Sequence, residues 1–206
     1  MPKTKSFDKN SYEYDNWFEE NYNIFESELN AIKSFIPKGL NGIEIGVGTG
    51  KFASALNIDI GIEPSQKMAE IARSRGIKVL AGVAENLPIE EAQFDFAMMV
   101  TAICFFDNIK KAFTEANRII KDNGFLIVAF IDKDSKLGTL YQRNKQSSKF
   151  YSNATFYSVN EIKEFLTATG FKNIEYRQTI YSLENTLHTV NEGYGQGSFV
   201  VIKAVK

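Results

Sequence analysis

The stretch IEIGVGTG, Ile43 to Gly50, places three glycines at alternate positions directly after a short apolar run that carries one acid. Glycine accepts positive φ angles and lets a ligand approach the backbone closely. Parallel α/β sheets bind their ligands at the carboxyl ends of such buried strands. The stretch therefore predicts a strand followed by a turn at a ligand site.

The chain after this stretch alternates short apolar runs with amphipathic segments. Near-continuous apolar strands separated by helices indicate parallel strands that are covered on both faces, which is a doubly wound sheet. Gly76 and Gly124 follow two of the helical patterns and predict where these helices end. The expected strands are 42–46, 58–63, 77–82, one beginning at 94, 125–130, 171–181 and 198–205, and the expected helices between them are 51–56, 65–76 and 109–124.

Three further segments complete a single expected domain, 1–206. Residues 7–36 are rich in aromatic and acidic residues at roughly helical intervals and predict one or two helices. Residues 132–157 are polar and aromatic without a clean period. Ser158 and Glu161 form a capping box that predicts the start of a helix running to Gly170. The expected parts are an N-terminal helical lid (1–38), a cofactor-binding core (39–131), a substrate-side cap (132–157) and a C-terminal helix with strands (158–206).

Composition narrows the class of protein. Hydrophobic residues make up 44% and charged residues 24% of the chain, which is typical of a globular protein. The net charge of −1 offers no basic surplus for nucleic-acid phosphates. One cysteine, Cys104, and one histidine, His188, argue against a disulfide, a metal site or a Ser-His-Asp triad. With no signal-peptide core and no run of ~18 apolar residues, we expect a cytoplasmic monomer or homodimer without a membrane partner.

The glycine spacing limits the ligand. It reads G-x-G-x-G rather than the dinucleotide pattern G-x-G-x-x-G, and Lys51 is followed by Phe52, so no phosphate loop is present. Glu63 ends the second expected strand, where a carboxylate can accept hydrogen bonds from two ribose hydroxyls. The segment GVAENLP, 82–88, follows the third strand at the same edge and could flank an adenine ring. These features favour a nucleoside ligand.

Five stretches in order, IEIGVGTG, GIEPSQKMAEIAR, GVAENLP, FDFAMMV and AFTEANRIIKDNGFLIV, resemble the consecutive motifs of class I S-adenosylmethionine-dependent methyltransferases. The similarity is to the small-molecule branch that resembles ubiquinone-biosynthesis enzymes, and it covers about residues 40–130. It implies S-adenosylmethionine as cofactor and an amine, phenol, carboxylate or heterocycle as methyl acceptor. The implied fold is a Rossmann-like, mostly parallel seven-stranded sheet with an antiparallel last strand and N-terminal helices as a lid.

The resemblance also implies residue roles. Gly46, Val47 and Gly48 would run along the methionine part of the cofactor, in the same turn as Gly50 and with Glu44 nearby. Glu63 would hold the ribose. The remaining expected cofactor contacts are Pro64 and Met68 on the adenine, Ala84 and Glu85 at its edge, Thr101 at the methionine end, and Trp17 from the lid.

Two positions depart from the family pattern. Val83 stands where an aspartate often accepts from the adenine amino group. The segment TAICFF, 101–106, lacks the family's frequent histidine, which puts a histidine base in doubt.

Methyl transfer depends mainly on positioning, and a base is needed only for a nucleophile that arrives protonated. The candidate catalytic residues are Thr101, Tyr22 and Tyr151. Trp17, Phe18 and Tyr22 are expected to form an aromatic lid, although burial against the sheet is an alternative role. The residues expected to line an acceptor pocket, unless they belong to a mobile flap, are Tyr141, Phe150, Tyr151 and Phe156.

Two other functions stay open. The fold also suits a non-catalytic S-adenosylmethionine-binding sensor. Tyr141 and Lys145 form the Y-x-x-x-K pair of short-chain NAD(P)-dependent reductases, but Val128 occupies the upstream position where that family needs a serine.

Overall fold

Strand β1 (Gly42–Ile45) lies inside the sheet, and all four of its residues are buried. In the computed structural model, which describes residues 3–206, β1 pairs in parallel with β2 (Ile60–Ile62) on one side and β4 (Phe94–Val100) on the other. The order of strands therefore continues away from β1 on one side and away from β4 on the other. Their carboxyl ends form the switch point at which such sheets leave room for a ligand.

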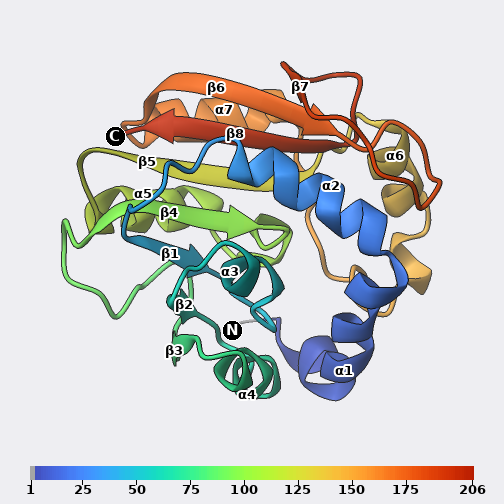
Figure 1. The fold of residues 1–206 in the computed structure, drawn as a ribbon, viewed down its shortest axis with the longest axis horizontal. Coiled ribbons are helices and arrows are strands. Elements are labelled where there is room, and N and C mark those ends of the chain that lie inside the picture. Colours follow the sequence, from blue (N-terminus) through green and yellow to red (C-terminus); the bar gives the residue numbers. More distant parts are fainter. Residues whose placement is uncertain (1–2) are drawn as a thin grey trace.

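The complete sheet has the order β3-β2-β1-β4-β5-β8-β6-β7 (Figure 1). Its last long strand, β8, runs antiparallel to both of its neighbours, β5 and β6. The expected α/β class and the antiparallel last strand are confirmed, and the two-residue strand β7 adds an eighth strand at the edge. The strands not yet given are β3 (Lys78–Leu80), β5 (Ile120–Ile131), β6 (Lys172–Thr179), β7 (Asn191–Glu192) and β8 (Phe199–Val205).

Helices cover both faces of this sheet, as the sequence predicts. Alternate residues of β4 show why: Ala97 and Met99 belong to the core beneath α5 and α7, whereas Phe96 and Met98 belong to the core beneath α2, α3 and α4. Helix α2 crosses β6 and β8, and α1 packs beside α4 (Figure 1). The helices are α1 (Lys5–Glu20), α2 (Tyr22–Lys33), α3 (Lys51–Ala55), α4 (Gln66–Ser74), α5 (Ile109–Ile119), α6 (Lys136–Arg143) and α7 (Val159–Ala168), with 3₁₀ turns η1 (Ile103–Phe105) and η2 (Lys145–Ser147).

The helix expected over 109–124 is shorter than the sequence predicts. It ends at Ile119, and Ile120 already pairs with Phe94 as the first residue of β5. Ile120 is fully buried, so its packing in the sheet overrides the helical period that includes it. Gly124 does not stop the helix. It lies inside β5, where an added Cβ would come within 2.4 Å of the Asp95 carbonyl oxygen.

The predicted start of the helix after 157 is confirmed. Ser158 and Glu161 form both hydrogen bonds of the capping box at the N-terminus of α7. The segment 132–157, for which the sequence shows no clean period, contains the short helix α6 and the turn η2.

Gly50 has a packing role that yields a stability prediction. It caps α3 with a φ of +81°, and an added Cβ would lie 2.4 Å from Ile77 Cδ1 and 3.2 Å from Ala72 Cβ. Gly39 has a similar φ of +82°, but nothing lies within 4 Å of its added Cβ. We expect Gly50→Ala to lower the free energy of unfolding by roughly 2–4 kcal/mol, since positive-φ strain and overpacking add. Gly39→Ala should lose only ~1 kcal/mol. Urea denaturation measures both, and equal losses would contradict the packing role.

Candidate active site

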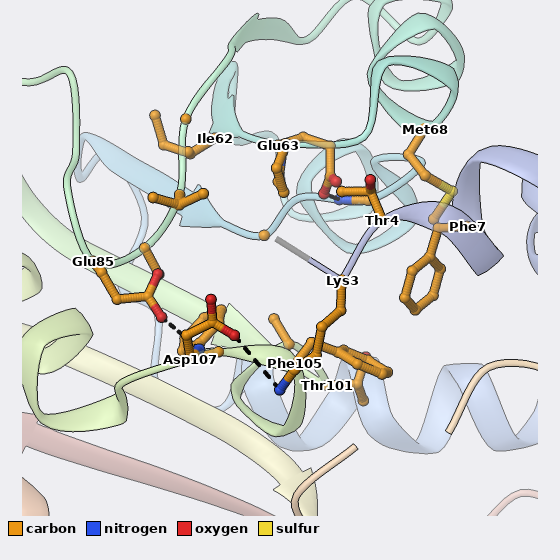
Figure 2. Close-up of a pocket in the computed structure, with 18 of the residues that line it drawn as sticks. Lys3, Thr4, Phe7, Ile62, Glu63, Met68, Glu85, Thr101, Phe105 and Asp107 are labelled. Carbon is orange, nitrogen blue, oxygen red and sulfur yellow. Dashed lines mark hydrogen bonds and ion pairs between the residues drawn. The ribbon is translucent and has the colours of Figure 1, made fainter. Parts of the chain in front are cut away.

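A cavity of about 270 Å³ opens at the carboxyl ends of β1, β2 and β4 (Figure 2). Its walls come from the glycine-rich turn, the loops after β2, β3 and β4, and the beginning of the chain. The residues that line it are Lys3, Thr4, Phe7, Tyr14, Gly46, Gly48, Ile62, Glu63, Pro64, Met68, Gly82, Val83, Ala84, Glu85, Val100, Thr101, Ala102, Phe105, Phe106 and Asp107.

The glycine-rich turn forms the floor of this cavity. Gly46 and Gly48 have φ angles of +79° and +55°, a region that other residues rarely adopt. An added Cβ on Gly46 would lie 2.7 Å from Ala102 Cβ, so the site needs bare backbone there. The N–H groups of Gly46 and Val47 both donate to the Ile62 carbonyl oxygen, at 2.8 and 2.9 Å. The turn is therefore held firmly against the end of β2.

Glu63 closes one side of the cavity. Its Oε2 accepts from the Gly48 N–H at 2.9 Å and its Oε1 accepts from the Ser65 N–H at 2.8 Å. Burial raises the pKa of the Glu63 carboxyl to about 7, although these two N–H groups oppose the shift, and the nearby Asp8 adds to it. Each oxygen retains acceptor capacity beyond its single backbone bond. The carboxylate form is thus suited to accept two hydroxyl groups.

The lining also has an apolar part, to which Met68, Val83 and Ala84 belong. The Glu85 carboxylate does not point freely into the cavity, because its Oε1 accepts from the N–H groups of Asp107 and Asn108 at 2.7 and 3.0 Å. Asp107 lies on the same rim, and its carboxylate pairs with Lys3 at 3.8 Å (Figure 2). Position 83, where the family often has an aspartate, is a valine in this chain. Asp107 instead supplies a carboxylate at the rim of the cavity.

A second, smaller cavity of about 20 Å³ adjoins the first. Thr101 lines both cavities and has a φ of +49°, a strained value for a threonine. Such strain is typical of positions that serve a site. The other residues of the second cavity are Ile103, Cys104, Phe130, Ile131, Tyr141, Tyr151, Phe156 and Tyr157.

Comparison with known proteins identifies the family to which this chain belongs. The methyltransferase-domain family matches residues 43–128. The crystal structure of a Thermotoga maritima protein, described as an S-adenosylmethionine-dependent methyltransferase and possible histamine N-methyltransferase, superposes with a TM-score of 0.95 at 46% identity, over 98% of this chain and 99% of that one. This chain belongs to the S-adenosylmethionine-dependent methyltransferases.

Two further relatives extend this family assignment. An uncharacterized protein of Methanocaldococcus jannaschii is 48% identical over 97% of this chain and 98% of its own length. A demethylmenaquinone methyltransferase of Staphylococcus aureus is 21% identical over 69% of this chain and 72% of its own length. The expected class I methyltransferase family, enzymatic activity and cofactor are confirmed.

The lining of the cavity, considered apart from the related proteins, also fits S-adenosylmethionine. It combines a bare-backbone cradle at Gly46 and Gly48, a two-oxygen acceptor at Glu63 and an apolar wall around Met68. Among the described residues that line it, Lys3 is the one cation, against the acids Glu63, Glu85 and Asp107. That balance suits a positively charged sulfonium cofactor.

The expected cofactor residues divide into two groups. Those brought to the cavity are Gly46, Gly48, Glu63, Pro64, Met68, Ala84, Glu85 and Thr101. Those placed outside its lining are Glu44, Val47, Gly50 and Trp17.

The residues outside the lining are packed against other parts of the protein or buried among them. Glu44 is fully buried, and its Oε2 has no hydrogen-bond partner among the described residues. The Val47 side chain lies where it would contact any Cβ added to Gly61, and Gly50 packs against Ile77.

The structure places the three residues of the expected aromatic lid outside the linings of both cavities. Trp17 and Tyr22 are 37% and 55% exposed and line neither cavity, and Phe18 is buried against Phe25. Tyr22, one of the candidate catalytic residues, is therefore not part of either lining.

The lid of the cavity is built from the beginning of the chain and α1 instead, through Lys3, Thr4, Phe7 and Tyr14. Phe7 and Tyr14 are seven residues apart, a spacing that puts them on one face of a helix and that the sequence already displays. Helix α1 is kinked at Asn10, whose φ of −128° is not helical.

Among residues 3–206, no helix is long and apolar enough to cross a membrane.

The pKa of Glu63 predicts how cofactor affinity depends on pH. Hydroxyl donors favour the carboxylate form, so binding competes with a proton below the folded pKa of about 7. We expect affinity for S-adenosylhomocysteine to be roughly tenfold weaker at pH 6 than at pH 8. Glu63→Gln should bind weakly and without this pH dependence. Calorimetric titration measures both proteins, and a flat profile for the unmodified chain would contradict the role of Glu63.

Proposed function

We propose that this methyltransferase moves a methyl group from S-adenosylmethionine to a nucleophilic atom of a small molecule by in-line displacement. The observation that carries the proposal is the position of Thr101 in the wall that two cavities share. The larger cavity has the features of a cofactor site. In this proposal the smaller one, lined by Tyr141, Tyr151 and Phe156, receives the acceptor.

In this proposal the cofactor is held by residues of the larger cavity. Gly46 and Gly48 accommodate its methionine part, Glu63 accepts from both ribose hydroxyls, and Met68 and Ala84 pack on the adenine. When bound, the cofactor supplies an electrophilic methyl group on a positively charged sulfur. The protein's own contribution is to align the acceptor and to exclude water.

The aromatic residues of the cap support water exclusion. Phe7 from α1 packs edge-on against Phe105 at 4.9 Å and stacks on Phe150 at 5.6 Å between ring centroids. Phe105 stacks in turn on Tyr151 at 5.8 Å. The lid, the loop after β4 and the segment 132–157 therefore close over the site as one packed layer.

The acceptor classes proposed are an amine, a phenol, a carboxylate or a heterocycle. Two relatives bear on these classes: the Thermotoga protein is described as a possible histamine N-methyltransferase, and the Staphylococcus protein is a demethylmenaquinone methyltransferase. The 46% identity of the first gives it more weight here than the 21% of the second.

The test is a methyl-transfer assay with S-adenosylmethionine carrying a labelled methyl group and a fractionated small-molecule extract. We expect label in one small product. S-adenosylmethionine binding without any labelled product would favour the sensor. Binding of NADPH in place of S-adenosylmethionine would favour the reductase suggested by Tyr141 and Lys145.

A substitution at Glu63 tests the ribose assignment directly. Glu63→Ala should weaken S-adenosylhomocysteine binding by ~1.5–3 kcal/mol, because it removes a charged acceptor from two hydroxyls. Glu70→Ala is the matched control, since Glu70 lies on nearby α4, pairs with Lys67 and does not line the cavity. Calorimetric titration compares the two variants. Equal affinities would show that Glu63 does not hold the ribose.

A further inference from the structure

The residues that lead into α1, together with its first turn, form part of the lid over the larger cavity. Three residues of this leading segment, residues 3–9, line that cavity: Lys3, Thr4 and Phe7 (Figure 2). Every residue of the leading segment is half-buried or exposed. Its one apolar side chain, Phe7, packs on rings of the loop after β4 and of the segment 132–157. A segment with so few buried contacts can open locally while the rest of the fold stays intact.

Asn10 separates the leading segment from the rest of α1. Its φ and ψ angles of −128° and 29° are not helical, so the helix is kinked there. The Asn10 side-chain amide donates to the Ser6 carbonyl oxygen at 2.8 Å, which joins the two sides of the kink. Positions where the regular helix is interrupted can absorb a change in backbone angles. Asn10 is therefore placed to act as a hinge.

The part of α1 after the kink is fixed to the floor of the cavity. The Asp15 carboxylate pairs with Arg75 at 2.7 Å. The same guanidinium donates to the Thr49 carbonyl oxygen of the glycine-rich turn at 2.8 Å. Further along the helix, Phe18 is buried in the hydrophobic core. Residues 11–20 thus belong to the same rigid body as the turn, in contrast to the leading segment.

One short hydrogen bond ties the leading segment to the cofactor site. The Ser65 hydroxyl donates to Asp8 Oδ1 at 2.6 Å, and the Ser65 N–H donates to Glu63 Oε1 at 2.8 Å. Hydrogen bonds to a carboxylate are stronger than those between neutral groups. The ion pair between Lys3 and Asp107 is longer, at 3.8 Å, and its carboxylate is exposed, so it contributes less. Asp8 is therefore the main polar latch of the segment.

We propose that Asp8 is a positioning residue for S-adenosylmethionine: its hydrogen bond to Ser65 keeps residues 3–9 closed over the bound cofactor, and these residues swing about Asn10 when the cofactor exchanges. This inference rests on the proposed function, because it takes the larger cavity as the cofactor site. Asp8 does not line that cavity and acts through Ser65.

A latch has a kinetic signature that a cofactor contact lacks. When the same segment must open for entry and for exit, weaker closure speeds both steps, and the dissociation constant changes less than either rate constant. Loss of a direct contact raises mainly the dissociation rate constant and weakens affinity accordingly. The two rate constants of cofactor binding therefore distinguish the two roles.

Surface plasmon resonance with the immobilised full chain and S-adenosylhomocysteine measures both rate constants. The folded pKa of Glu63 is about 7, so at pH 8 this acid is mostly ionised whether or not Asp8 is charged. For Asp8→Ala we expect both rate constants to rise by roughly fivefold or more, with a dissociation constant within about threefold of that of the unmodified protein. Asp8→Asn, whose amide oxygen can still accept the Ser65 hydroxyl, should lie closer to the unmodified protein.

Two further variants separate the latch from general effects on α1. Glu13→Ala is the matched control, since Glu13 lies beyond the kink, lines neither cavity and forms an exposed ion pair with Lys149. Its rate constants should match those of the unmodified protein. Because Asp8 acts through the Ser65 hydroxyl, the double variant of Asp8→Ala and Ser65→Ala should exchange the ligand more slowly than the product of the two single effects.

Limited proteolysis tests the movement in the unmodified protein. Lys5 and Lys9 are exposed lysines of the leading segment, and Lys38 is an exposed lysine in the loop after α2. Cleavage of a structured segment requires local opening. We expect saturating S-adenosylhomocysteine to slow tryptic cleavage after Lys9 by roughly fivefold or more and to change cleavage after Lys38 much less.

The outcomes distinguish the two proposals. Rate constants that do not rise together in Asp8→Ala, an equal rise in Glu13→Ala, or cleavage after Lys9 that is insensitive to S-adenosylhomocysteine would each overturn the latch while leaving methyl transfer intact. Failure of the unmodified protein to bind S-adenosylhomocysteine would instead contradict the proposed function itself.

Discussion

The Glu63 carboxylate is the constraint on which the cofactor site depends. Its two oxygens accept backbone N–H groups of Gly48 and Ser65, which joins the glycine-rich turn after β1 to the beginning of α4. The Ser65 hydroxyl then donates to Asp8 at 2.6 Å, so the same chain of hydrogen bonds reaches the lid helix α1. Floor, wall and lid of the cavity therefore meet at one buried acid. Because burial raises its pKa to about 7, the protonation state of this acid also links the geometry of the site to pH.

The acceptor side is organised by aromatic contacts rather than by hydrogen bonds. Phe7, Phe105 and Tyr151 lie in successive ring contacts that connect α1, the loop after β4 and the segment 132–157. Aromatic packing of this kind excludes water and tolerates rearrangement when a ligand enters. The site thus combines a rigid donor half with an adaptable acceptor half.

Much of the donor half was predictable, because it is local in the sequence. Gly46 and Glu63 follow directly on strands of the parallel sheet, and Gly48, Met68 and Ala84 lie within a few residues after a strand, so the order of the motifs places all five at one edge. The errors arise where tertiary packing overrides a local pattern. Ile120 has helical spacing but is buried in β5, and Gly50 has the spacing of a ligand contact but packs against Ile77. Trp17 has the chemistry of a lid residue, yet its side chain is 37% exposed and lines neither cavity.

The sequence by itself determined the α/β class, the methyl donor and most of the residues proposed to lie beside it, since strand-end glycines and acids are brought together by any parallel sheet of this order. Only the tertiary structure decided which residues form the lid and what faces the acceptor. Phe7, Asp107 and Tyr151 are separated by long stretches of chain, and no local period relates them. Their meeting depends on how α1, α2 and the segment 132–157 pack onto the sheet. That packing follows from long-range burial of aromatic side chains, which a pattern of neighbouring residues does not record.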